Sequence, residues 1–110
     1  MQQELLKEKN SKSNNDVIIA QDKLAKELET VEKYIKSGEF TEAEVYLKSL
    51  LELDEKNAQI FNHLGVVYFN LADYNKAENR FLKALKIDPN LVDVYFNLGI
   101  LYQKRGEFRK

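Results

Sequence analysis

Side chains that commonly carry catalysis or bind transition metals are scarce in this sequence. His63 is the only histidine, and the 110 residues include no cysteine. A thiolate nucleophile, a disulfide and a metal site built on several histidines therefore cannot form. Because His63 lies beside Leu64 on an expected helix, we interpret it as a structural or groove-lining residue, with ligand contact as the alternative. The sequence thus predicts no enzyme, no cofactor and no metal site.

The numbers of basic and acidic residues indicate which class of partner the chain can bind. Lys and Arg total 17 and Asp and Glu total 18, which gives a formal net charge of -1. Binding of nucleic acid needs a clear excess of basic side chains, so we expect a protein or peptide partner and no nucleic acid. Residues 1–15 lack the apolar core of a signal sequence, and apolar runs such as 17–20 are too short to span a bilayer. We therefore expect a cytoplasmic protein without membrane insertion.

Similar residues recur along the chain at an interval of 34, which indicates a repeat protein. With one proline and four glycines in the whole chain, turn residues are too few for a fold of many short strands. The matched sets are Tyr34, Tyr68 and Tyr102; Gly38, Ala72 and Gly106; Phe40, Tyr74 and Phe108; and the pairs Ala43 with Ala77, Leu47 with Phe81, Leu53 with Ile87 and Asp54 with Asp88.

The middle interval carries the fullest pattern, and a partial copy follows in the same phase. The full pattern is Phe61, Leu64, Gly65, Tyr68, Ala77, Phe81 and Pro89, and the partial copy is Tyr95, Leu98, Gly99 and Tyr102. This pattern resembles the tetratricopeptide repeat, and the resemblance covers residues 24–110. It implies an all-α fold, a right-handed superhelical stack of antiparallel helix pairs (an α-α solenoid) with about five helices.

The spacing of these residues also fits packed helices. Two apolar stripes follow helical periodicity, and the small residues Gly65 and Ala77 allow two helices to approach closely. We therefore expect each repeat to contain two antiparallel helices, A and then B, joined by a short turn. The stripes are Phe61, Leu64, Gly65 and Tyr68 on the A helix and Ala77, Phe81, Ala84 and Leu85 on the B helix.

Turn residues mark where the helices end. Gly38 and Gly106 suit the left-handed residue that closes a helix, and Ala72 occupies the same position between them. A positive φ at Ala72 would cost up to roughly 1 kcal/mol. Asp88 and Pro89 are expected to end the second B helix, because proline cannot continue it.

Capping boxes are expected at the start of the B helices. Thr41 is followed by Glu44, and one period later Asn75 is followed by Glu78. In such a box the first side chain caps the helix, and the glutamate bonds back to its backbone.

The repeat divides the chain into four segments. We expect residues 1–15 to be a disordered polar segment, residues 16–57 a degenerate first repeat with an extended A helix, residues 58–91 a second repeat, and residues 92–110 the first helix of a truncated third repeat. The first repeat is interpreted as degenerate because Glu27, Thr30 and Val31 replace Phe61, Leu64 and Gly65.

Residues near both ends have expected roles. Asp16 is expected to cap the first helix, and Val17 and Ile18 to cover the end of the stack. Arg109 occupies the capping position of a third B helix, which would lie beyond Lys110 in a longer protein.

The resemblance implies that the A helices line a concave groove in which partner segments bind. Carboxamides there can bond a peptide backbone, and the apolar side chains offer contact area; tolerated surface residues are the alternative. The candidate groove residues are Asn62, Val66, Phe69, Asn70, Phe96, Asn97, Ile100 and Gln103, with Leu28, Glu32 and Ile35 on the first helix. Family members that clamp the C-terminal carboxylate of chaperones use Lys, Asn and Arg at positions that hold Leu28, Glu32, Asn62, Asp93 and Asn97 here. The cations are missing, so we exclude that specialised function.

The favoured function is a protein–protein interaction scaffold that receives a peptide or helical segment of a partner in this groove. A self-assembly module that stacks through exposed repeat ends is the alternative, and an enzyme accessory domain is a third reading. We expect Val94, Leu98 and Leu101 to pack on the second B helix. An apolar patch of Tyr95, Gly99, Tyr102 and Phe108 is then expected to give a weak homo-oligomer.

Overall fold

The computed structural model describes residues 22–106. The chain divides into two compact units, Met1–Thr30 and Val31–Lys110, which are described separately. Residues 22–30 of the first unit and 31–36 of the second are α-helical. The expectations for residues 1–15, Asp16, Val17, Ile18, Phe108 and Arg109 lie outside the described residues.

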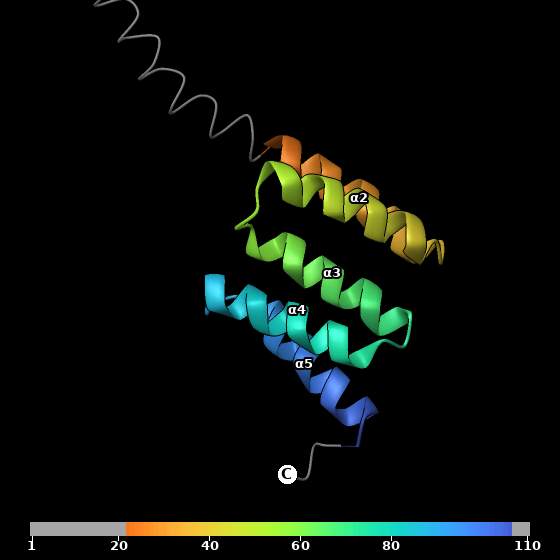
Figure 1. Cartoon of the computed structure of the whole chain (residues 1–110), viewed down its shortest axis with the longest axis vertical. Helices are drawn as coiled ribbons and strands as arrows, with labels where there is room; N and C mark the ends of the chain where they lie inside the picture. Colours follow the sequence, from red (N-terminus) through yellow and green to blue (C-terminus); the bar gives the residue numbers. More distant parts are fainter. Residues whose placement is uncertain (1–21, 107–110) are drawn as a thin grey trace, which may run out of the picture. The chain divides into compact units, whose positions relative to one another are not determined.

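The second unit continues as a series of helices joined by short turns. Each of the four runs opposite to the one before it (Figure 1), and each packs on its neighbour, with α3 and α4 in the most extensive contact. The residues that the structure describes contain no strand, so the expected all-α solenoid is confirmed. The helices are α2 (Phe40–Leu53), α3 (Ala58–Asn70), α4 (Tyr74–Ile87) and α5 (Val92–Lys104).

The predicted stripes form the core between α3 and α4. Phe61, Leu64, Gly65 and Tyr68 of α3 are buried, as are Ala77, Phe81 and Ala84 of α4, whereas Leu85 is half-buried. Gly65 lies directly against the ring of Phe81, which is fully buried. The close approach expected at Gly65 therefore occurs, and the aromatic ring fills the space that a glycine leaves.

The turns after the A helices have the expected left-handed residue. Ala72 has a φ of 62°, beside 77° at Gly38 and 74° at Gly106. The Ala72 N–H donates to the Phe69 carbonyl at 3.0 Å and the Asp73 N–H to the Tyr68 carbonyl at 2.9 Å. These two bonds form the Schellman motif that commonly closes helices.

The predicted capping boxes are wrong. The N-caps of α2 and α4 are Glu39 and Asp73, so both helices begin before Thr41 and Asn75. Asp73 accepts from the Lys76 N–H at 3.3 Å, while Glu39 makes no side-chain cap. The physical reason is the tight left-handed turn at Gly38 and Ala72, after which a single non-helical residue, Glu39 or Asp73, precedes the helix.

Polar residues mark the start of α3 and the end of α4. The Asn57 side chain caps α3 by accepting from the N–H groups of Gln59 at 2.9 Å and Ile60 at 3.2 Å. The helix α4 ends at Ile87 with Asp88 as its C-cap, as the Asp88-Pro89 pair predicts.

The last helix packs on the core through one face only. Val94, Leu98 and Leu101 of α5 are buried, as expected. Tyr95 is 53% exposed, and its hydroxyl donates to the Pro89 carbonyl at 2.8 Å. A side chain added at Gly99 would meet open space.

Candidate functional site

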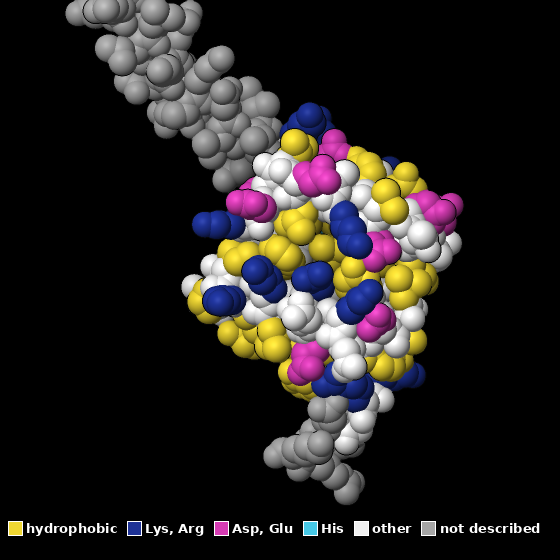
Figure 2. Space-filling view, in the orientation of Figure 1, with side chains coloured by type: hydrophobic (Ala, Val, Ile, Leu, Met, Phe, Trp, Pro, Cys, Tyr) yellow, Lys and Arg dark blue, Asp and Glu magenta, His cyan; other side chains and the backbone are white. Residues whose placement is uncertain are grey.

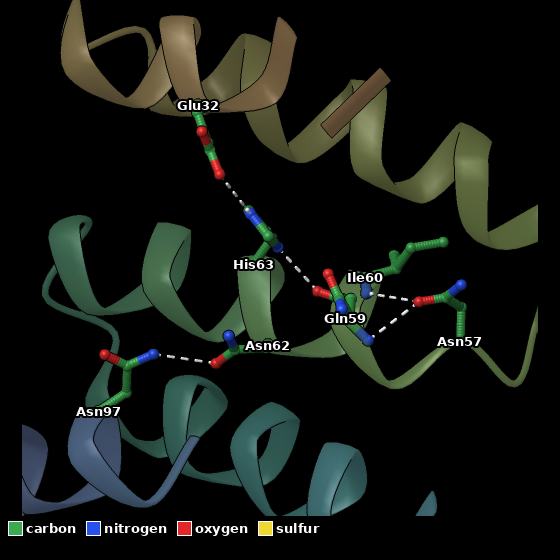
Figure 3. Close-up of polar contacts among 7 residues, drawn as sticks. All are labelled: Glu32, Asn57, Gln59, Ile60, Asn62, His63 and Asn97. Atoms are coloured by element: carbon green, nitrogen blue, oxygen red, sulfur yellow. Dashed lines mark hydrogen bonds and ion pairs between the residues drawn. The ribbon is translucent and has the colours of Figure 1, made fainter. Parts of the chain in front are cut away.

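The groove residues predicted for the second and third A helices lie on α3 and α5, which are in contact. One side-chain hydrogen bond joins these two helices: Asn97 Nδ2 donates to Asn62 Oδ1 at 2.9 Å (Figure 3). The two amides are half-buried and lie 35 residues apart in the sequence. The sequence-predicted carboxamides are thus brought together, from two different repeats.

The amide pair retains hydrogen-bonding capacity. An asparagine amide carries two N–H donors and one oxygen acceptor, and the bond between the pair uses one donor of Asn97 and the oxygen of Asn62. Among the described residues, no hydrogen bond uses Asn62 Nδ2 or Asn97 Oδ1. A donor on Asn62 and an acceptor on Asn97 are therefore available.

Apolar side chains accompany the amides. Phe96 is 70% exposed and Ile100 is 39% exposed on α5, while Val66 of α3 is half-buried. Phe96 adjoins Asn97 in the sequence, and Ile100 lies one helical turn further on. The surface can therefore offer both backbone hydrogen bonds and apolar contact area.

The remaining predicted residues are less available or stand apart. The ring of Phe69 packs on that of Tyr74 at 5.5 Å between centroids, and Asn70 Nδ2 donates to the Val66 carbonyl of its own helix at 2.8 Å. Gln103 is exposed. Of the first-helix candidates, Leu28 belongs to the first unit, whereas Glu32 and Ile35 belong to the second.

His63 is held by two contacts (Figure 3). Its Nδ1 lies 2.8 Å from the Gln59 carbonyl oxygen, and its Nε2 lies 3.6 Å from Glu32 Oε1. Both ring nitrogens are thus engaged within the chain, which favours the structural or groove-lining interpretation. Glu32 reaches His63 from residues 31–36, so this contact also links two neighbouring A helices.

Three family models match overlapping parts of the chain between residues 34 and 106. Two of them, each described as tetratricopeptide repeat, match residues 34–57 and 57–87, and a third, described as TPR repeat, matches residues 73–106. The chain belongs to the tetratricopeptide-repeat family. Repeats of this family generally act as protein–protein interaction modules. A comparison with curated proteins found no significant match.

Hydrogen bonds between a tyrosine and a glutamate connect successive tetratricopeptide repeats. The glutamates are the two that were expected in capping boxes. A hydrogen bond from Tyr68 lowers the pKa of the Glu44 carboxyl, and Lys48 adds to this effect from 3.4 Å. Burial, followed by the bond to Glu44, raises the pKa of the Tyr68 hydroxyl. One period later, a hydrogen bond from Tyr102 lowers the pKa of Glu78. Tyr68 of α3 and Tyr102 of α5 therefore each bind the B helix of the preceding repeat.

Arg105 strengthens the second of these links. Its NH1 donates to Asn75 Oδ1 at 3.2 Å and its NH2 to Glu78 Oε1 at 3.0 Å. Sequence reasoning missed this contact because no periodic signal marks an arginine 27 residues after its glutamate. The Tyr–Glu links, by contrast, recur at the repeat interval and were detectable in principle.

A shallow apolar hollow of about 410 Å³ lies elsewhere on the second unit. It contains none of the predicted groove residues, so we prefer the α3 and α5 surface as the candidate site. The hollow is lined by Tyr34, Thr41, Glu42, Val45, Tyr46 and Ser49.

The part of the chain that the structure describes has no cluster of residues that could hold a metal ion. Within the same residues, no helix combines the length and the apolar character needed to cross a bilayer.

Proposed function

We propose that this chain is a non-catalytic scaffold that binds a peptide or helical segment of a partner protein on the surface of α3 and α5. The observation that carries the proposal is the Asn62–Asn97 pair, with an available donor and acceptor beside Phe96 and Ile100. The matches to tetratricopeptide-repeat models support a protein-binding role in general.

The chemistry of the pair fits a polypeptide backbone. A peptide presents N–H and C=O groups, so Asn62 Nδ2 can donate to a carbonyl while Asn97 Oδ1 accepts from an N–H. Each bond adds about 0.5–1.5 kcal/mol net. A fully buried aromatic covers about 150–250 Å². Because Phe96 is 70% exposed, covering its exposed part is worth roughly 3–4 kcal/mol at about 25 cal/mol per Å² before association costs. Apolar contact then supplies most of the affinity, and the amides set the register.

The remaining expectations accompany this proposal. We propose that residues 16–57, 58–91 and 92–110 act as successive repeat segments and that the chain works in the cytoplasm. No nucleic acid is part of the proposed function, because the formal net charge is -1.

Peptide selection tests the proposed surface. A displayed peptide library would be selected against the chain, and the affinity of the enriched peptides measured by calorimetry. Phe96→Ala with Ile100→Ala should weaken binding at least about tenfold, which corresponds to about 1.4 kcal/mol. Sequence alone suggests Phe69 and Asn97 for this test. Both contact other side chains of the chain, so their replacement would also alter the fold.

The matched control is Leu53→Ala, which truncates an exposed leucine on α2. Enriched peptides should bind this variant as they bind the parent chain. Equal affinity for the parent and for the Phe96 and Ile100 variant would contradict the proposed surface.

Self-assembly through exposed repeat ends remains the second candidate function. The exposed side chains of Val92, Tyr95 and Phe96 on α5 favour it, because a large apolar patch on a monomer often marks an interface.

A further inference from the structure

A row of basic side chains runs along α4, apart from the amide pair. Lys76, Arg80 and Lys83 follow one another at helical spacing, so they share one face of the helix. Lys76 Nζ lies 5.5 Å from the centre of the Tyr68 ring, and Lys83 Nζ lies 5.8 Å from that of Phe61. Figure 2 shows Lys and Arg side chains gathered over α3 and α4 on this face. The basic row therefore covers buried aromatic residues of α3.

Within residues 22–106, two cations of this face have no acidic partner. Lys76 pairs with Asp73 at 3.8 Å, and Lys48 of α2 pairs with Glu44 at 3.4 Å. Among the described residues, neither Arg80 nor Lys83 forms an ion pair. Arg80 contacts the neutral side chain of Asn79, with its NH1 3.0 Å from Asn79 Oδ1. The face thus keeps a local positive excess, although the whole chain has a formal net charge of -1.

The repeat fold does not require these cations. The equivalent positions in the first repeat, 34 residues earlier, hold an acid, an aromatic and a hydroxyl residue and still fold as the helix α2. They are Glu42, Tyr46 and Ser49. The basic row is therefore a property of this one helix, and the charges of Arg80 and Lys83 are available for binding.

We propose that the basic row of α4, together with Lys48, docks an acidic helical segment of a partner protein. At 1.5 Å per residue along α4, Arg80 and Lys83 lie about 6 Å and about 10.5 Å from Lys76. A helix with glutamates at i, i+4 and i+7 presents carboxylates at the same spacing. The rings beneath the cations hold Lys76 and Lys83 in place, which lowers the entropy lost on binding.

An acidic peptide fits this face better than a nucleic acid does. Binding to phosphates depends on a broad basic surface that releases many counterions. Here the paired carboxylates Glu44 and Asp73 lie beside the basic row and would repel a continuous phosphate backbone. A protein segment can place its carboxylates opposite Arg80 and Lys83 and keep neutral side chains near Glu44 and Asp73.

Fluorescence anisotropy tests the proposal with a labelled synthetic helix that carries Glu at i, i+4 and i+7. We expect the chain to bind it, and added salt to weaken binding. Arg80→Gln with Lys83→Gln should reduce affinity at least about tenfold. Lys83→Gln alone should reduce the affinity by a smaller factor. Because Lys83 is exposed, this single variant tests the proposal even if the double variant fails to fold.

Three controls make the result specific. Lys36→Gln with Lys104→Gln removes the same charge from exposed positions outside α4 and should leave affinity nearly unchanged. A scrambled peptide of the same composition should bind more weakly. The Phe96→Ala with Ile100→Ala variant should bind the acidic helix as the parent chain does, which separates this surface from the one proposed above.

Four outcomes would overturn the proposal. They are no binding of the acidic helix by the parent chain, an equal loss in the Lys36 and Lys104 variant, equal binding of the scrambled peptide, and tighter binding of a DNA duplex of similar length. The last result would assign the face to nucleic acid instead.

Discussion

Gly65 of α3 lies directly against the aromatic ring of Phe81 of α4. A Cβ at position 65 would lie 2.5 Å from Phe81 Cδ1 and 2.8 Å from Cζ, closer than carbon atoms approach without displacement. The ring cannot move aside easily, because Phe81 is among the largest fully buried side chains. The glycine is therefore required by packing, and not by its backbone conformation.

Replacement of Gly65 should reveal this packing. We expect Gly65→Ala to lower the free energy of unfolding by about 1–3 kcal/mol, because overpacking outweighs the gain of roughly 1 kcal/mol in helix propensity. Gly99→Ala is the matched control, since Gly99 occupies the same repeat position in a helix with open space around it. That variant should be stabilised by up to about 1 kcal/mol. Urea unfolding measures the free energy of unfolding of both variants. Equal changes in the two variants would contradict the packing argument.

Ala72 offers the opposite case, in which glycine should improve the chain. Its φ of 62° is unfavourable for a residue with a Cβ, so Ala72→Gly should stabilise the fold by up to roughly 1 kcal/mol. Gly38→Ala, at a φ of 77° with no neighbour to clash, should destabilise it by a similar amount. A fall in melting temperature for Ala72→Gly would show that the left-handed turn is not what limits stability there.

The Tyr–Glu links should make stability depend on pH at both extremes. The pKa of Glu44 and that of Glu78 are lowered in the fold, chiefly by hydrogen bonds from Tyr68 and Tyr102. Their contribution is present at neutral pH and is lost as the pH falls through the lowered carboxyl values. Burial raises the pKa of Tyr68, so its contribution holds below the ordinary tyrosine range and is lost as the pH rises through the raised value.

Substitutions separate the two effects. Glu44→Gln should flatten the decline in melting temperature at acid pH. Tyr68→Phe should cost about 1–3 kcal/mol at neutral pH, because it removes a bond to a charged group, and should also flatten the alkaline decline. Glu42→Gln removes the same charge from an exposed position of α2. If Glu42→Gln changed the decline in melting temperature at acid pH as much as Glu44→Gln does, the hydrogen bond between Glu44 and Tyr68 would not be the cause of that decline.

The sequence predicted the helices well where one local rule dominates. The left-handed turn at Ala72 followed from its alignment with Gly38 and Gly106, and the end of α4 followed from Pro89. The prediction of capping boxes was wrong because two local patterns, a left-handed turn and a capping sequence, overlap in the same residues. The Schellman turn starts the B helix at Tyr74, before the capping pattern at Asn75 is reached. Glu78 is then free to bind Tyr102.

The candidate site was predicted only in part, because it depends on contacts between repeats. Helical spacing placed Asn62 and Asn97 on the A helices but contains no information on their mutual hydrogen bond. It likewise could not show that Phe69 packs on Tyr74. Such pairings depend on the offset between neighbouring helices, which side-chain packing determines.

Weak self-association is the last prediction, and the exposed face of α5 is its basis. Val92 is 75% exposed and Tyr95 53% exposed, next to the exposed Phe96. Tyr102, expected in this patch from sequence, is instead half-buried and bonded to Glu78, which makes the patch smaller. Covering a few hundred Å² at about 25 cal/mol per Å² supplies several kcal/mol, much of which the entropy of association offsets.

We therefore expect a monomer at micromolar concentration and a measurable dimer fraction only near millimolar concentration, followed by sedimentation velocity. Val92→Ser with Tyr95→Ser should abolish the dimer, because the pair supplies much of the exposed apolar area. Leu82→Ser is the control, since it removes an exposed leucine from α4 and should leave the dimer unchanged. A strictly monomeric chain at millimolar concentration would exclude the α5 face as a self-association surface. If only the Leu82→Ser variant lost the dimer, the self-association surface would lie on α4 and not on α5.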